Sequence, residues 1–234
     1  MATVFSRRRA DRFFFPLIAL LLVAYVLLGF WPSYIGAGLV FAKLPSALVH
    51  VHSVLYVGWI ALFATQIALV ETRHVATHRK LGIVLGWWAV AMILVGPATA
   101  IMAVRREPSG LSVSGFAGDL AQTVGFAILI SAGLARRRNA AAHKRLMTLA
   151  SAAIIGPALA RWPFDFIQSG PPFALACLYL LQPMLVIAYD LVTLRRVERA
   201  TWLGLGVMVL VVLCFLTLPA WPGWQRFTSW VVHF

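Results

Sequence analysis

Long apolar runs, separated by short polar segments, make up almost the whole chain. Each run holds about 18 residues or more, the length that an α-helix needs to cross the roughly 30 Å hydrocarbon layer of a membrane. The pattern predicts an all-α, polytopic membrane protein, because backbone hydrogen bonds inside a membrane must be satisfied within helices. We expect seven spanning helices, over residues 13–31, 47–70, 78–104, 116–135, 143–162, 172–194 and 201–221.

The composition agrees with an integral membrane protein. The chain has 234 residues, 62% of them hydrophobic, and its mean hydropathy is +0.88. A soluble domain of that length has no core large enough to cover so much apolar surface. We therefore treat residues 1–234 as a single integral membrane domain, in which the aromatic tail at 222–234 is expected to lie in the membrane interface.

The positive charges follow the connections between the apolar runs. The formal net charge is +13, but the cations do not form a continuous face, so we expect no nucleic-acid partner. Fifteen of the 20 Lys and Arg residues lie on the side of the N-terminus when the seven runs cross in alternation. Because positively charged loops are retained inside, we predict a bacterial inner-membrane protein with a cytoplasmic N-terminus and a periplasmic C-terminus.

Two of the predicted helices begin and continue alike. The motifs "HRKLG" at 78–82 and "HKRLM" at 143–147 open apolar runs that later reach "GPATA" at 96–100 and "GPALA" at 156–160. We expect the second and third helices, and the fourth and fifth, to be two copies of one hairpin. Together they would form a four-helix core with the other three helices around it. The prolines of the two pentads are expected to kink equivalent helices.

A first group of polar residues lies at the inner membrane boundary. His78 and His143 open the two related helices, and two neutral imidazoles on facing helices can bind one haem iron. Arg79 and Arg145 are candidate partners for the haem propionates. His74 precedes His78 by four positions, a spacing that suits metal ligands, so His74, His78 and His143 are candidate metal ligands. The alternative is ordinary anchoring of these side chains in the interface.

A second group lies near the opposite boundary. His52 and Tyr56 share one helix face, Asp119 and Gln122 lie on the fourth run, and Arg161 lies at the end of the fifth. We expect a polar network here that lines a substrate, quinone or metal site, with His52, Asp119 and Arg161 as candidate catalytic residues. The alternative is structural: an ion pair between Asp119 and Arg161, with His52 hydrogen-bonded between helices.

At "HRKLG" and "HKRLM" the chain resembles a loose group of bacterial multi-span membrane proteins, some of whose relatives are associated with haem–copper oxidase assembly. In that group a His-Arg/Lys-Arg/Lys-aromatic/Leu motif opens helices, as at His78 and His143 here. The pattern also resembles bundles of the cytochrome b561 and ferric-reductase type, in which paired histidines on four helices hold haem b. The chain departs from these bundles, because Asp119 stands where a second pair would need a histidine.

Three functions are compatible with these residues. The first is a redox-linked oxidoreductase or electron-transfer protein, with haem b or another transition metal at His78 and His143 and a periplasm-facing pocket. The second is a non-enzymatic carrier, or an assembly factor that binds lipid, metal or a membrane protein partner. The third is a cofactor-free membrane enzyme acting on a lipid-like substrate, with His52 as the base and Asp119 orienting it.

Overall fold

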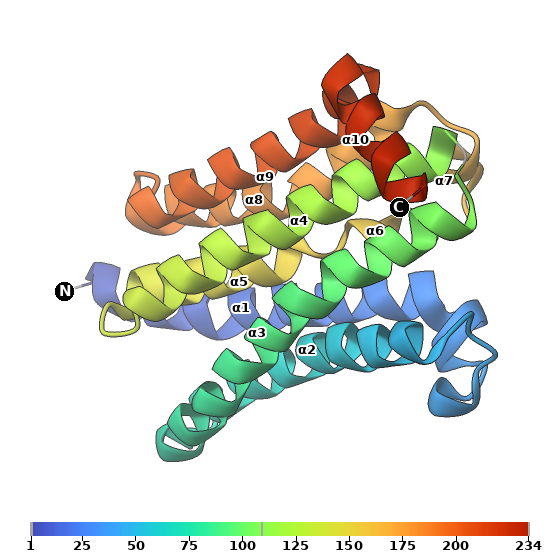
Figure 1. Ribbon diagram of the computed structural model, residues 1–234. Helices are drawn as coiled ribbons and strands as arrows, with labels where there is room; N and C mark the ends of the chain where they lie inside the picture. The colour runs from blue at the N-terminus through green and yellow to red at the C-terminus, as the bar shows by residue number, and fades with distance from the viewer. Residues whose placement is uncertain (1, 109, 234) are drawn as a thin grey trace.

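The computed structural model describes residues 2–108 and 110–233, including the side chains of residues 9–39, 41–108 and 113–233. Its described part is helical and contains no strand, which confirms the all-α prediction (Figure 1). In chain order the elements are α1 (Ala2–Phe30), η1 (Trp31–Ile35), η2 (Leu39–Phe41), α2 (Ala47–Glu71), α3 (Val75–Arg106), α4 (Gly110–Ala135), α5 (Ala140–Ala153), α6 (Gly156–Leu159), α7 (Asp165–Gln168), α8 (Pro172–Leu194), α9 (Arg199–Thr217), η3 (Leu218–Ala220) and α10 (Pro222–His233).

Within the described residues, six helical segments are long and apolar enough to cross a membrane: α1 together with η1, α2, α3, α4, α8 and α9. They form one helical bundle (Figure 1), so the prediction of a polytopic membrane protein is confirmed. The fifth expected helix, 143–162, is interrupted, because α5 ends at Ala153 and α6 begins at Gly156. A count of seven continuous spanning helices is therefore not confirmed, although α5 and α6 follow one another alongside α4 (Figure 1).

Proline explains the interruption, but only at one of the two related positions. Pro157 has no N–H group to donate to the carbonyl of Ala153, four residues earlier, and α5 ends at that residue. Pro97 occupies the corresponding pentad in α3, yet α3 continues through it over 32 residues. The expectation of two equivalent kinked helices is therefore wrong in this respect: one helix is continuous and the other is broken.

The bundle has two ends, which we name by the chain segments that they carry. The N-side holds the start of α1 and the α2–α3, α4–α5 and α8–α9 connections. The C-side holds the α1–α2, α3–α4 and α6–α8 connections together with α10. Most of the Lys and Arg residues lie in the N-side segments. The assignment of the N-side to the cytoplasm stays a prediction.

The centre of the bundle is α5 rather than a symmetric set of four helices. From Arg145 to Ala153, all side chains of α5 except that of Met147 are buried, and α5 packs against α1, α4, α8 and α9. The main apolar core also includes residues of α1, α8 and α9. Small residues permit close contact here: a Cβ atom on Gly204 of α9 would lie 2.2 Å from a methyl group of Leu149. The core thus draws on more helices than the expected four.

The C-terminal tail forms α10, which lies against the C-side ends of α3 and α4 (Figure 1). Trp224 and Val231 of α10 are buried in a small second core with Phe116 of α4. Arg105 of α3 ties this helix down by donating a hydrogen bond of 2.8 Å to the carbonyl of Val231. Trp230 is exposed, as expected for an aromatic side chain in the interface.

Candidate functional site

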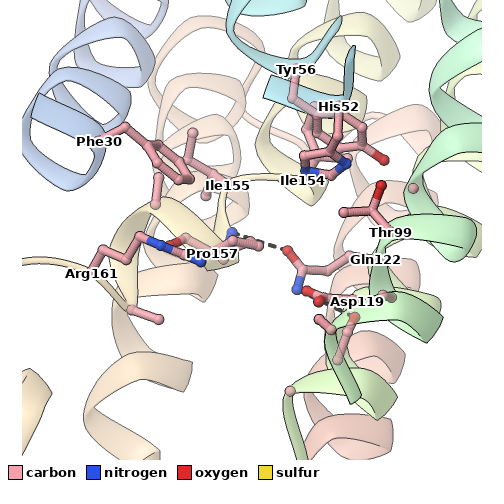
Figure 2. A pocket seen from close by; sticks show the side chains of 18 of the residues that line it. Phe30, His52, Tyr56, Thr99, Asp119, Gln122, Ile154, Ile155, Pro157 and Arg161 are labelled. Carbon is pink, nitrogen blue, oxygen red and sulfur yellow. Dashed lines mark hydrogen bonds between the residues drawn. The ribbon is translucent and has the colours of Figure 1, made fainter. Parts of the chain in front are cut away.

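A cavity of about 490 Å³ opens in the C-side half of the bundle. Its wall is formed by α1, α2, α3, α4, α8 and α9, together with the chain break between α5 and α6 (Figure 2). Apolar side chains cover much of it, among them Val26, Phe30, Val57, Ile60, Ile154, Ile155, Val211, Val212 and Phe215. Polar residues also line it, among them Arg106 and the three candidate catalytic residues.

The structure brings His52, Asp119 and Arg161 together on the wall of this cavity, as expected from the sequence. His52 comes from α2, Asp119 from α4 and Arg161 from the connection after α6. Figure 2 shows Arg161 and Asp119 entering from different sides of the view, with His52 and Tyr56 above them. Residues more than 100 positions apart in the sequence thus share one site.

Arg161 is held in place without a direct carboxylate partner. Its guanidinium donates a hydrogen bond of 2.7 Å to the carbonyl of Pro157 and lies 5.0 Å from the ring centroid of Phe30. Asp119 acts on it electrostatically, but the described contacts include no direct ion pair between the two. The predicted structural ion pair is therefore not formed.

His52 is placed by an aromatic contact. Its ring stacks on Tyr56, one turn later in α2, with the ring centroids 4.2 Å apart. Its Nδ1 atom is buried and has no hydrogen-bond partner among the described residues. Tyr56 donates to the carbonyl of Met92 at 3.3 Å, and it fits there because Gly96 has no side chain. Neither Asp119 nor another described carboxylate hydrogen-bonds to His52, so the predicted orientation of the base by Asp119 is not seen.

The chain break between α5 and α6 forms part of the cavity wall and is stabilised by neighbouring helices. Tyr179 of α8 donates a hydrogen bond of 2.7 Å to the carbonyl of Ala153, the group that Pro157 leaves without a helical partner. Gln122 of α4 accepts a hydrogen bond of 3.0 Å from the N–H of Gly156. Both freed backbone groups are therefore satisfied by side chains, as a membrane interior requires.

Tyr179 and Phe30 are site residues that the sequence alone does not reveal. Each is an aromatic residue in an apolar run, where nothing distinguishes it from a residue that packs in the core or faces lipid. The one available signal was Pro157, because a proline in a spanning segment implies that some neighbour must satisfy the freed carbonyl group. The sequence does not show which helix supplies that neighbour.

The candidate haem and metal ligands lie on the N-side. His143 Nδ1 lies 2.8 Å from the carbonyl oxygen of Gly133, whereas His78 Nδ1 is buried without a partner among the described residues. The two imidazoles interact electrostatically. His74 is exposed and its ring bonds to the hydroxyl of Thr72 at 2.9 Å. The described residues contain no group of three or more His, Cys, Asp or Glu that could hold a metal ion, so the three histidines form no such group.

The two candidate propionate partners differ. Arg79 is exposed, but Arg145 is completely buried and each of its three side-chain nitrogen atoms donates a hydrogen bond. The Nε and Nη2 atoms of Arg145 donate to one carboxylate oxygen of Asp190, at 2.8 and 2.5 Å, and its Nη1 atom donates to the carbonyl of Ala141 at 2.8 Å. The other Asp190 oxygen accepts from the hydroxyl of Thr201 at 2.6 Å. Arg145 therefore joins helices and does not suit a propionate.

A second ionic contact joins α1 to the same region. Lys144 lies 2.6 Å from the carboxylate of Asp11, and the hydroxyl of Tyr189 donates to that carboxylate. Together with the pair of Arg145 and Asp190, this contact links α1, α5, α8 and α9 on the N-side. The ion pairs that the structure describes thus lie at this end of the bundle, whereas Arg161 and Asp119 in the cavity form none.

Comparison of the chain with protein-family models, with curated proteins and with solved structures gives no match.

Proposed function

We propose that the protein binds a lipid-like small molecule in the C-side cavity and acts as a non-enzymatic membrane binding protein or carrier. One observation carries this proposal: Arg161 and Asp119 both face a largely apolar cavity, but they do not pair with each other. Charged groups within a membrane protein are costly unless they are paired, and they often mark a substrate site. A bound molecule with polar and apolar parts would supply the missing partners.

The dimensions and lining of the cavity support a ligand of this kind. A volume of about 490 Å³ lies within the range of small-molecule sites, which are mostly apolar with a few placed polar groups. The contacts favour binding over base catalysis. His52 stacks on Tyr56 and receives no orienting hydrogen bond from a described carboxylate, as a general base normally would.

The test is to identify what copurifies with the protein. We expect native mass spectrometry of detergent-purified protein to show a bound lipid-like molecule that is reduced at least several-fold in Arg161→Gln. Arg226→Gln is the matched control, because Arg226 is an exposed arginine of α10 and does not line the cavity. A wild-type protein without any such molecule, even after incubation with membrane lipids, would overturn the proposal.

A second candidate function is binding of a b-type haem, or another transition metal, between His78 and His143. The supporting observation is the contact of His143 Nδ1 with a backbone carbonyl, since that hydrogen bond leaves Nε2 available as a ligand. His78 and His143 would be the axial ligands, and the haem would supply one-electron redox chemistry. A visible spectrum tests this: a Soret band that shifts on reduction and is lost in His143→Ala supports it, and a colourless, metal-free protein refutes it.

A further inference from the structure

The described lining of the cavity includes three charged residues, Arg106, Asp119 and Arg161, of which the last two come from different elements and carry opposite signs. Arg161 follows α6 and Asp119 lies on α4, and both side chains line the same space (Figure 2). Each acts electrostatically on the other without direct contact among the described ion pairs. Asp119 and Arg161 thus present a negative group and a positive group that a ligand can reach separately, and Arg106 adds a second cation to the lining.

Arg161 has unused hydrogen-bonding capacity. A guanidinium has five N–H donors, and only the bond to the carbonyl of Pro157 is described for this one. The Phe30 ring, 5.0 Å from the guanidinium carbon, limits the directions in which the head group can point. The remaining donors suit a phosphate or carboxylate, which arginine binds with paired hydrogen bonds.

Asp119 requires hydrogen-bond donors from a ligand, whereas Arg161 requires acceptors. An ionised carboxylate only accepts hydrogen bonds, and the structure describes none to this side chain. The one described side-chain hydrogen bond to this residue ends on its backbone carbonyl, which accepts from the hydroxyl of Thr123 at 2.9 Å. A cationic group with N–H donors, such as a primary ammonium, would satisfy the carboxylate.

We propose that the ligand is a zwitterionic amphiphile whose anionic group binds Arg161, whose ammonium group binds Asp119 and whose apolar chain lies along the aliphatic wall. This inference rests on the proposed function and narrows it to one ligand class. A purely anionic ligand would leave its charge facing Asp119, and a purely cationic one would face Arg161. An ethanolamine phospholipid has this chemistry, and so does its free head group, phosphoethanolamine.

The experiment compares two phospholipids that share their acyl chains. Detergent-purified protein is titrated with phosphatidylethanolamine and with phosphatidylglycerol, and binding is followed by native mass spectrometry. We expect wild type to bind the zwitterionic lipid at least tenfold more tightly. Asp119→Asn should remove this preference by weakening phosphatidylethanolamine binding alone, whereas Arg161→Gln should weaken binding of both lipids.

Asp165→Asn is the matched control, because Asp165 is an exposed carboxylate on α7 that does not line the cavity. Its lipid preference should equal that of wild type. Free phosphoethanolamine is added in a competition arm: displacement of the lipid supports recognition of the zwitterion without its chains, and no displacement supports recognition of the whole lipid.

The outcomes separate this inference from the proposed function. If wild type binds the two lipids equally and Asp119→Asn weakens both to the same extent, the inference of a zwitterionic ligand is overturned. The proposal of a lipid-like ligand in the cavity then still holds. Binding that neither cavity variant changes overturns both proposals. The elution volume and helical circular dichroism of each variant show whether it is folded.

Discussion

The guanidinium of Arg145 and the carboxylate of Asp190 are both fully buried, and every described contact between them lies within hydrogen-bonding distance. Two charges in a low-polarity interior stabilise the fold only while both are present, because each alone would be an uncompensated buried charge. Thr201 of α9 donates a hydrogen bond to the other carboxylate oxygen of Asp190. This pair therefore acts on stability, whereas the unpaired Arg161 and Asp119 are available to a ligand.

Removal of one member of the pair should be strongly destabilising. We expect Asp190→Asn to lower the free energy of unfolding by about 3–5 kcal/mol, because it leaves the Arg145 charge buried without its partner. Asp165→Asn, at an exposed carboxylate, should change it by less than about 0.5 kcal/mol. Denaturant unfolding in detergent micelles measures both, and equal stabilities of the two variants would contradict this role.

Among the helices, the break between α5 and α6 is the feature that shapes the cavity wall. Pro157 frees the carbonyl of Ala153, and Tyr179 and Gln122 reach across from other helices to satisfy the backbone there. The same groups fix the shape of the cavity wall. A Cβ atom on Gly156 would lie 2.5 Å from the side-chain oxygen of Gln122, so the glycine lets the two approach.

Tyr179→Phe tests whether these cross-helix bonds stabilise the break. We expect a loss of about 1–3 kcal/mol of unfolding free energy, because the variant leaves a buried carbonyl without its described donor. Tyr34→Phe is the matched control, since Tyr34 also lines the cavity and the structure describes no hydrogen bond of its hydroxyl. If the two variants have the same denaturant midpoint, the bond to Ala153 is not important for stability.

The spanning helices could be predicted from the sequence because each is a local property of an apolar run. The clustering of His52, Asp119 and Arg161 could also be predicted, since depth in the membrane follows from position in a run. The partner of Arg145 was missed, because Asp190 is 45 positions away and depth alone does not show which helices touch. The helix break was missed because a proline is compatible with a continuous helix, as Pro97 shows.

In the molecule as a whole, the described ion pairs lie at the end of the bundle opposite to the cavity. Ionic contacts involving Asp11 and Asp190 join α1, α5, α8 and α9 on the N-side, and the cavity lies in the C-side half. A molecule bound in the cavity would therefore exchange with the C-side more readily than with the N-side. Which compartment it meets depends on whether α5 and α6 together cross the membrane, because that crossing decides which side each later segment faces.

Single cysteines on the two sides of this segment test the crossing in the full chain. Cys177 and Cys214 are first replaced by alanine, and a cysteine is then placed at Arg137, before α5, or at Ser169, after α7. We expect a membrane-impermeant maleimide added to intact bacterial cells to label position 169 and not position 137. This result follows if α5 and α6 carry the chain across and the arginine-rich N-side is cytoplasmic.

Two reference positions make the labelling result decisive. Lys43 precedes α2 on the C-side and Arg73 precedes α3 on the N-side, and the continuous helix α2 separates them. A cysteine at position 43 should be labelled and one at position 73 should not; the reverse pattern would show that the orientation is inverted. If position 169 instead stays unlabelled, like position 137, α5 and α6 do not cross the membrane. The break between them is then not a membrane-embedded part of the cavity wall.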